Sequence, residues 1–444
     1  MVHTPRAFEL TLATIIMTAT LFKLGTLLLA VAILLIGHGL QLTLLPIRAE
    51  LLGWTTSAIG ITASAYYSGL VVGSIVIPGI VARIGHIRAF MVMGALATMA
   101  LLGAGLLNDF TAWMVLRFAT GFAFAGLYMV MESWLSEAST RENRGSVLAI
   151  YTIICLVGMV LGQGLLSIAD PSTLDLFAIG AALLCLAIIP IGLTRMTAPH
   201  PLPHVRLDLR AMLRASPVPV VCALLGGLVT GSVWAVGPLV GRSFGLEGGA
   251  IGGLMSAAIT GGALSQFPVG RLSDRVDRRF VIAALAIVGM VVSIGGWLLS
   301  SDIGYALFGA MFLVGACSMP IYALCIATAS DNTDMSMIQI GSGILIMHSA
   351  GSIIGPLIVA PLMTWQGGSV FFLYLAVCFG LAAAWAAYRI VLVDRPQTYE
   401  HTFESVPKTT PVILELSNDT PLEDGVEAGY VHPNDHPADA EDGG

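Results

Sequence analysis

The stretch GRLSDRVDRR, residues 270–279, places six charged side chains between two long apolar runs. Only 11% of the 444 residues are charged, so this cluster marks a turn that leaves an apolar environment. Residues 58–84 align without a gap with residues 250–276, at an offset of 192. The matched positions include Ala58 with Ala250, Gly60 with Gly252, Ser64 with Ser256, Gly69 with Gly261 and Arg83 with Arg275. The chain is therefore expected to contain two copies of one unit.

The composition is that of a membrane protein. Hydrophobic residues make up 56% of the chain, and the mean hydropathy is +0.88. Most of the apolar residues occur in runs of roughly 20, the length that an α-helix needs to cross a bilayer. We predict an all-α integral membrane protein with twelve transmembrane helices. Their centres lie near residues 35, 69, 98, 123, 157, 184, 229, 260, 290, 314, 350 and 381.

The arginines predict the orientation of these helices. The arginines between the spans fall on one side of the predicted membrane, apart from Arg48 and Arg242 on the other. Positively charged loops stay in the cytoplasm, so the first side is expected to be cytoplasmic. An even number of spans then places both termini there. We expect a multi-pass protein of the cell (inner) membrane.

The chain divides into five segments. Residues 1–23 are an expected cytoplasmic extension, with Met17 as an alternative start, because their apolar run is short and Thr-rich. Residues 24–196 and 217–391 form two bundles of six predicted helices, joined by a Pro-containing cytoplasmic linker over residues 197–216. Residues 392–444 carry 12 acidic and 2 basic side chains and are expected to be a disordered tail.

Two six-helix halves joined by a linker resemble the plan of the major facilitator superfamily, or MFS. The charged turn is similar to the family's loop signature G-x-L-A-D-R-x-G-R-R, with Gly270, Asp274, Arg275 and Arg278 in register. The first-half copy, PGIVARIGHIR, keeps Arg83 but has alanine at position 82 in place of the aspartate. The stretch VMESWLSEASTRENRG is most like the YcaD-type branch. The resemblance implies the MFS fold and a secondary transporter that works by alternating access.

The residues of the charged loops are candidates for a cytoplasmic gate. Asp274 could accept hydrogen bonds from the N-terminus of a facing helix, and the arginines could pair with carboxylates or lipid head groups. A simple topological anchor with solvated charges is the alternative. The resemblance adds a Glu-x6-Arg pair after the fourth span. The candidate gate residues are Arg83, Glu137, Arg144, Gly270, Asp274, Arg275 and Arg278.

Polar side chains within the predicted spans are candidates for the solute pathway or for coupling. Arg117 and Glu132 are 15 residues apart, about 22 Å along a helix, so they cannot neutralise each other. Glu132 is interpreted either as a coupling or gating residue or as a structural one. A charge at the bilayer centre costs about 2.5 to 3.5 kcal/mol, which favours a function or a partner.

Histidines and aromatic residues complete the candidate set. His38 and Gln41 are three residues apart and share a helical face, and His348 lies in the eleventh span. The resemblance places Tyr128, Trp234 and Tyr322 on helices that line the family's cavity. Aromatic side chains there would suit an amphipathic organic solute. Ordinary packing explains all of these residues equally well.

The predicted function is secondary transport of a small organic solute, coupled to protons and directed outward. The export hypothesis depends on the glycines of span five, Gly158, Gly162 and Gly164, which resemble a family pattern associated with antiport. Gln163 stands where that pattern has proline. No nucleotide-binding motif, catalytic triad order or metal-ligand spacing is present, so we predict no enzyme activity, no cofactor, no metal and no nucleic-acid partner. The protein is expected to be a monomer in the lipid bilayer. The alternative is a non-transporting sensor or scaffold that signals through its acidic tail.

Overall fold

A computed structural model describes residues 6–139, 143–193, 209–299, 304–331, 333 and 335–392. The side chains of residues 6–23, 138, 144, 211 and 338 are outside the described part. The predicted acidic tail beyond residue 392 and most of the predicted linker also lie outside it. In the described residues, the expected N-terminal extension and the first span form one continuous helix, α1.

Thirteen α-helices account for nearly all of the described residues, and one short 3-10 helix, Leu165–Ser167, follows α5. The first half contains α1 (Arg6–Leu51), α2 (Thr56–Ile84), α3 (His86–Leu106), α4 (Phe110–Ala138), α5 (Arg144–Gly164) and α6 (Asp175–Gly192). A short helix, α7 (Leu209–Ala215), lies within the predicted linker. The second half contains α8 (Pro217–Ser243), α9 (Gly249–Ser273), α10 (Arg278–Trp297), α11 (Gly304–Ser330), α12 (Met337–Gln366) and α13 (Val370–Leu392).

Eleven of these helices are long and apolar enough to cross a membrane. The chain is thus a multi-pass, all-helical membrane protein in its described part. The helix left out is α9, the predicted span centred near residue 260. It has 25 residues, but many of them are glycine and serine, which lower its hydropathy. The number of twelve spans therefore stays a prediction.

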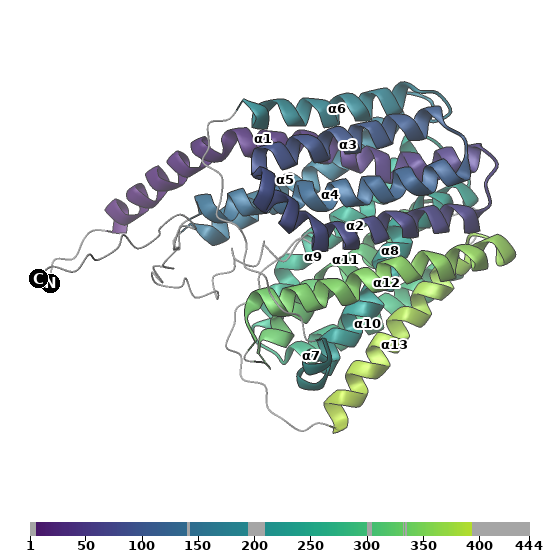
Figure 1. Cartoon of the computed structure of the whole chain (residues 1–444). Helices are drawn as coiled ribbons and strands as arrows, with labels where there is room; N and C mark the ends of the chain where they lie inside the picture. The colour runs from purple at the N-terminus through teal and green to yellow at the C-terminus, as the bar shows by residue number, and fades with distance from the viewer. Residues whose placement is uncertain are drawn as a thin grey trace, which may run out of the picture.

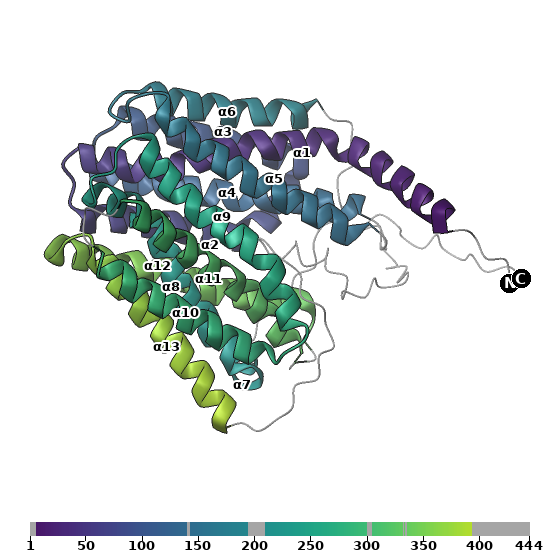
Figure 2. The same ribbon diagram turned by 180° about the vertical axis from the view of Figure 1, so that it is seen from behind.

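The helices pack into two similar bundles that lie side by side (Figures 1 and 2). In the first bundle α2 packs on α4, and in the second the equivalent helix α9 packs on α11. Both crossings are close because a glycine faces the backbone of the partner helix: Gly69 meets the carbonyl of Phe118, and Gly261 meets that of Phe312. Small residues permit such contacts between membrane helices, where dispersion forces drive packing. Gly69 and Gly261 are equivalent by the offset of 192, as the duplication predicts.

The most extensive contacts between the two bundles form two seams, α2 with α12 and α5 with α9, and α8 makes smaller contacts with α1 and α2. Both seams lie at the end of the molecule that contains Arg48 and Arg242, which we call the arginine-poor end. Gly60 of α2 abuts Pro356 and Ala360 of α12, and its equivalent, Gly252 of α9, abuts the carbonyl of Gln163 in α5. Two hydrogen bonds cross the first seam, between the hydroxyls of Ser57 and Thr364 (2.9 Å) and from Ser64 to the carbonyl of Ile353 (2.7 Å). The protein is therefore closed at this end.

The charged turn lies at the opposite, arginine-rich end, between α9 and α10. Asp277 caps α10 by accepting a hydrogen bond from the Arg279 amide (2.8 Å). Arg278 is completely buried and donates to the carboxylate of Asp331 (2.8 Å) and the carbonyl of Ala327 (2.9 Å) at the end of α11. Burial of a charge needs such partners. Arg278 thus anchors α10 to α11, a structural contact in addition to its predicted place in the gate.

The first half lacks this charged cluster. At the offset of 192, Ala82, His86 and Ser139 stand where the second half has Asp274, Arg278 and Asp331. His86 is buried, and its ring lies 6.2 Å from that of Trp134. The equivalent turns of the two bundles are therefore built from different interactions, one aromatic and one ionic.

Candidate functional site

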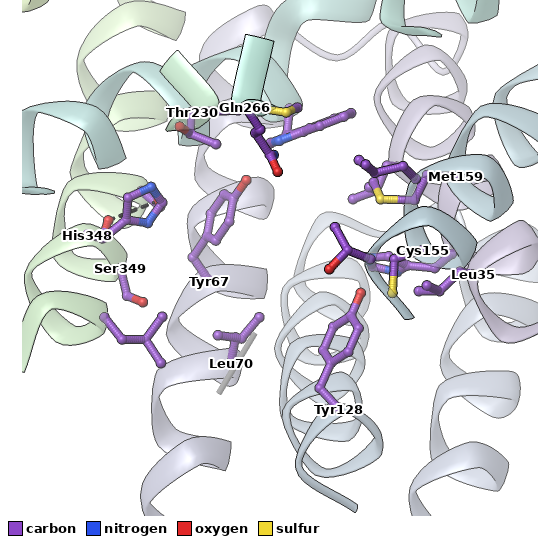
Figure 3. A pocket seen from close by; sticks show the side chains of 18 residues that line it. Leu35, Tyr67, Leu70, Tyr128, Cys155, Met159, Thr230, Gln266, His348 and Ser349 are labelled. Atoms are coloured by element: carbon purple, nitrogen blue, oxygen red, sulfur yellow. Dashed lines mark hydrogen bonds between the residues drawn. The ribbon is translucent and has the colours of Figure 1, made fainter. Parts of the chain in front are cut away.

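A cavity of about 210 Å³ lies between the two bundles (Figure 3). The first half contributes side chains from α1, α2, α4 and α5, and the second half from the equivalent positions of the fold, α8, α9, α11 and α12. The wall is formed by Leu35, His38, Leu42, Tyr67, Leu70, Tyr128, Thr152, Cys155, Leu156, Met159, Thr230, Trp234, Gln266, Met319, Leu345, His348, Ser349 and Ser352. Any relative movement of the bundles must change the shape of this cavity.

Four of the eight predicted pathway residues line the wall: His38, Tyr128, Trp234 and His348. The duplication explains part of this set. His38 is equivalent by the offset of 192 to Thr230, Leu42 to Trp234, and Leu156 to His348, and all six face the cavity. The cavity therefore straddles the pseudo-symmetry axis that relates the two halves.

The other predicted residues of the first half lie behind the wall. Gln41 is fully buried, and its Nε2 lies 2.8 Å from Nδ1 of His38, so the two residues interact on one helical face as predicted. Arg117 is also buried, and its guanidinium lies 4.8 Å from the centre of the Tyr66 ring. A cation over an aromatic face is attracted by about 0.5 to 2 kcal/mol, which offsets part of the cost of burial. Arg117 supports the aromatic cluster without reaching the solute space.

Glu132 is completely buried one helical turn beyond Tyr128 on α4. The hydroxyl of Tyr151 donates a long hydrogen bond of 3.4 Å to its carboxylate. Its charge also acts electrostatically on Tyr128, which lines the cavity, and on Tyr322 of α11 in the other half. Tyr322 in turn packs edge-on against His348, with ring centres 5.2 Å apart. The protonation state of Glu132 can therefore influence both halves of the cavity wall.

Sequence reasoning missed most of the polar wall. The wall residues of α5 follow one another at spacings of three, one and three residues: Thr152, Cys155, Leu156 and Met159. The same spacing recurs on α12, the helix equivalent to α5, at Leu345, His348, Ser349 and Ser352. Residues with this spacing share one face of a helix. Small polar residues on matching faces of equivalent helices were the signal available in the sequence.

The predicted gate residues are not gathered into one site in this conformation. Four of them are exposed at the arginine-rich end: Arg83, Glu137, Asp274 and Arg275. Gly270 is buried in the last turn of α9. Asp274 lies 3.5 Å from Arg278 of its own loop. The side chain of Arg144 is outside the described part. The proposed contact between Asp274 and the start of α5 stays a prediction for the conformation that is closed at this end.

An ion pair links the halves at the arginine-poor end. Nε of Arg242 in α8 lies 2.6 Å from the carboxylate of Glu50 in α1, and both side chains are about one-third exposed. The two positions are equivalent, since 242 − 50 = 192. Opposite charges at equivalent positions next to the pseudo-symmetry axis face each other across the interface. That relationship was readable in the sequence, where we considered Arg242 only as an exception to the arginine bias.

Reversing one charge of this pair should weaken closure at the arginine-poor end. Because half-exposed pairs contribute about 0.2 to 1 kcal/mol, we expect Glu50→Arg to raise the alkylation rate of a cysteine at Ser57 about two- to fivefold. The double variant Glu50→Arg, Arg242→Glu should return the rate to the original value. Glu247→Arg, an exposed site at the same end, is the matched control. Equal rates in all variants would show that the pair does not hold the seam.

No group of three or more His, Cys, Asp or Glu side chains that could hold a metal occurs among the residues that the structure describes. Five of the six cysteines are buried or half-buried. Only Cys155 lines the cavity. The wall side chains can bind a solute reversibly through van der Waals contact, aromatic stacking and hydrogen bonds.

Two pseudo-symmetric helical bundles around a shared cavity define a membrane transport protein. The profile of the Major Facilitator Superfamily matches residues 27–220 and 219–422, so the chain belongs to that family. It is 28% identical over 355 residues to the uncharacterized MFS-type transporter YcaD of Escherichia coli, covering 79% of this chain and 90% of that one. The protein is thus a secondary transporter, not an enzyme.

Solved structures share the fold. The nucleoside transporter NupG has a TM-score of 0.66 and 16% identity, over 84% of this chain and 99% of that one. A bacterial homolog of the human lysosomal transporter Spinster, in an inward-facing and occupied conformation, has a TM-score of 0.67 and 14% identity, over 84% and 97%. These likenesses concern the arrangement of helices alone.

Proposed function

We propose that this protein moves a small organic solute across the cell (inner) membrane by alternating access, driven by protons and directed outward. The observation that carries the proposal is the central cavity, whose wall is divided between the two halves. The seams close one end of the molecule through contacts that can separate: two glycine crossings, hydroxyl hydrogen bonds and a half-exposed ion pair. Rocking of one bundle against the other would open this end and close the opposite one.

Glu132 is the proposed coupling residue. An ionised carboxylate in an apolar protein interior is expensive, and protonation removes the cost. Glu132 has the burial that makes its charge state matter, and it acts on the wall residue Tyr128 of the first half and on Tyr322 of the second half, which packs against the wall residue His348. Arg117 keeps a separate, supporting role in this proposal.

The export proposal rests on the antiport-like glycines of α5, a helix that crosses α1 closely. Gly162 abuts the carbonyl of Ile36, and Gly39 abuts Met159. Gln163, at the position where the antiport pattern has proline, donates to the carbonyl of Gly39 (3.0 Å) and accepts from Thr43 (2.5 Å). These bonds tie α5 to α1, which supports a half that moves as one rigid unit.

Flux through purified protein in proteoliposomes tests the proposed function. Uptake of solutes from a metabolite and drug panel would be compared with and without a pH gradient. We expect a subset to accumulate only with a gradient of the sign that drives export. Flux without any gradient dependence would overturn proton coupling. If no solute moves, while deletion of residues 392–444 abolishes a cellular phenotype, the sensor or scaffold alternative would replace transport.

Asp274→Asn should bias the protein toward the conformation described here. In the conformation closed at the arginine-rich end, the Asp274 carboxylate is proposed to meet the positive N-terminus of α5, a contact of about 1 to 2 kcal/mol. Its loss should raise the labelling rate of a cysteine at Ser146 about tenfold. Ala82→Asp, which restores the carboxylate missing from the first half, should lower that rate. Identical labelling in Asp274→Asn and in the original protein would reduce the loop to a topological anchor.

Cysteine labelling also tests the proposed orientation. Cysteines at Asp109 and Gly368, at the arginine-poor end, should react with an impermeant maleimide from outside intact cells. A cysteine at Asp277 should react only after the membrane is permeabilised, because arginine-rich loops stay in the cytoplasm. Reversed labelling would overturn the orientation and the direction of transport that depends on it.

A further inference from the structure

Among the residues that the structure describes, no side chain that lines the central cavity is an Asp, Glu, Lys or Arg. The two buried charges of α4 are instead held behind the wall. Arg117 lies over the ring of Tyr66, and Glu132 accepts a hydrogen bond from Tyr151. The wall therefore offers hydrogen bonds and apolar surface, with no ion partner in direct contact.

The wall has two unlike faces (Figure 3). One side of the cavity carries the polar side chains of His348, Ser349, Thr230 and Gln266. The opposite side carries Leu35, Cys155 and Met159. Tyr67 and Tyr128 stand between them. The four polar residues of the first side all belong to the second half, and the three residues opposite them belong to the first half, which also contributes His38 and Thr152 to the wall. The difference arose at equivalent positions, since Leu156 stands where the second half has His348.

The hydroxyls of the polar face are already oriented. Thr230 donates to the carbonyl of Gly226 (2.8 Å), and Ser352 donates to that of His348 (3.0 Å). A hydroxyl that donates within the protein can also accept hydrogen bonds, because it has one hydrogen and two acceptor positions. The amide of Gln266 and the imidazole of His348 add both donor and acceptor atoms. This face can pair with an uncharged hydroxyl, amide or carbonyl group.

The lack of charged side chains in the wall affects solute binding most when the protein closes around the solute. When both ends are shut, an ionised solute exchanges its hydration for a wall that has no counter-charge, which costs several kcal/mol. A neutral polar group loses much less, because the wall returns its hydrogen bonds. An apolar body is stabilised in proportion to the apolar area that it buries.

Resting on the proposed transport function, we infer that the solute is an uncharged amphipathic molecule. Its apolar, ring-sized body would pack between the two tyrosines and the α5 face, and its single neutral hydrogen-bonding end would meet Gln266 and His348. The volume of about 210 Å³ suits one small ring system, since a cavity of about 150 Å³ holds benzene. Phosphorylated and other permanently charged metabolites are excluded from this class.

A set of three indoles of similar size tests the inference by binding alone. Tryptophol is neutral, indole-3-acetate is an anion and tryptamine is a cation. Saturable binding of tritiated tryptophol to the full-length protein in lipid nanodiscs would be measured near pH 8, above the ordinary imidazole pKa of about 6.5, with the unlabelled indoles as competitors. We expect tryptophol to compete at concentrations at least tenfold lower than either charged analogue. Equal competition, stronger competition by a charged analogue, or no saturable binding would overturn the inference.

Two matched variants of Gln266 link the selectivity to the wall. Gln266→Glu has nearly the same shape but places a carboxylate in the cavity, so it should reverse the order of tryptophol and tryptamine. Gln266→Leu removes the hydrogen bonds without adding charge, so it should weaken tryptophol binding about three- to tenfold and leave tryptamine weak. An unchanged order in Gln266→Glu would place the binding site elsewhere. Because no flux is measured, a protein that binds tryptophol without transporting it would contradict the transport proposal and leave the inference standing.

Discussion

Glu132→Gln is expected to abolish accumulation of the solute against its gradient while leaving exchange of solute across the membrane intact. Glutamine keeps the shape and can still accept the hydrogen bond from Tyr151, but it cannot release a proton. If Glu132 carries the coupling proton, accumulation driven by a pH gradient should fall more than tenfold, a loss of at least about 1.4 kcal/mol of coupling. Counterflow without a pH gradient should stay within about twofold of the original rate.

The readouts separate coupling from folding. Folded yield should be nearly unchanged, because Gln is close to Glu in volume and satisfies the same buried site. Glu132→Asp, which keeps an ionisable group, should retain part of the accumulation. Loss of yield together with activity would mean that Glu132 is structural, and normal pH-dependent accumulation in Glu132→Gln would remove it from the coupling mechanism.

Gly60→Val is expected to prevent closure at the arginine-poor end and to block transport. A methyl group at Gly60 would lie 2.5 Å from Cβ of Ala360 and 2.8 Å from the carbonyl oxygen of Pro356. Both contacts involve α12, in the other half, so the clash exists only while the seam is closed. Overpacking of this kind costs about 1 to 3 kcal/mol, enough to shift a two-state ratio about tenfold or more.

Gly79→Val on the same helix is the matched control. A Cβ atom at Gly79 would meet no atom within 4 Å, so this variant has the same change in helix propensity without the clash. We expect a cysteine at Ser57 to become accessible to maleimide in Gly60→Val and to stay protected in Gly79→Val, with transport lost only in the first. Equal protection and equal transport in both variants would show that the α2–α12 seam does not open during the cycle.

Much of the fold was predictable because a bilayer leaves few choices. Every backbone group in lipid must be hydrogen-bonded within its own segment, so a run of about 20 apolar residues becomes a helix. The offset of 192 residues then places equivalent helices in equivalent positions, as the crossings at Gly69 and Gly261 show. The helix α9 is the exception, since its many small residues serve a close contact with α11 and make its sequence less apolar.

The candidate site was predictable in part. His38, Tyr128, Trp234 and His348 line the cavity, and all four carry a polar group, which is rarely directed toward lipid within a membrane span. The Thr, Ser and Gln of the wall were missed. The hydroxyl of a Thr or Ser can donate to a backbone carbonyl of its own helix, as that of Thr230 does, so the sequence does not show which way the side chain faces.

The helical fold, the duplication and the distribution of charge between the two ends follow from composition, periodicity and spacing along the chain. The family was indicated by the resemblance of the charged turn to its loop signature. Three features became visible only in the folded protein: Arg278 is buried against Asp331, Glu50 meets Arg242, and the described residues of the cavity wall include no Asp, Glu, Lys or Arg. Each of these depends on the rotation and depth of one helix against another. Contacts over many small side chains set that geometry, and no single motif records it.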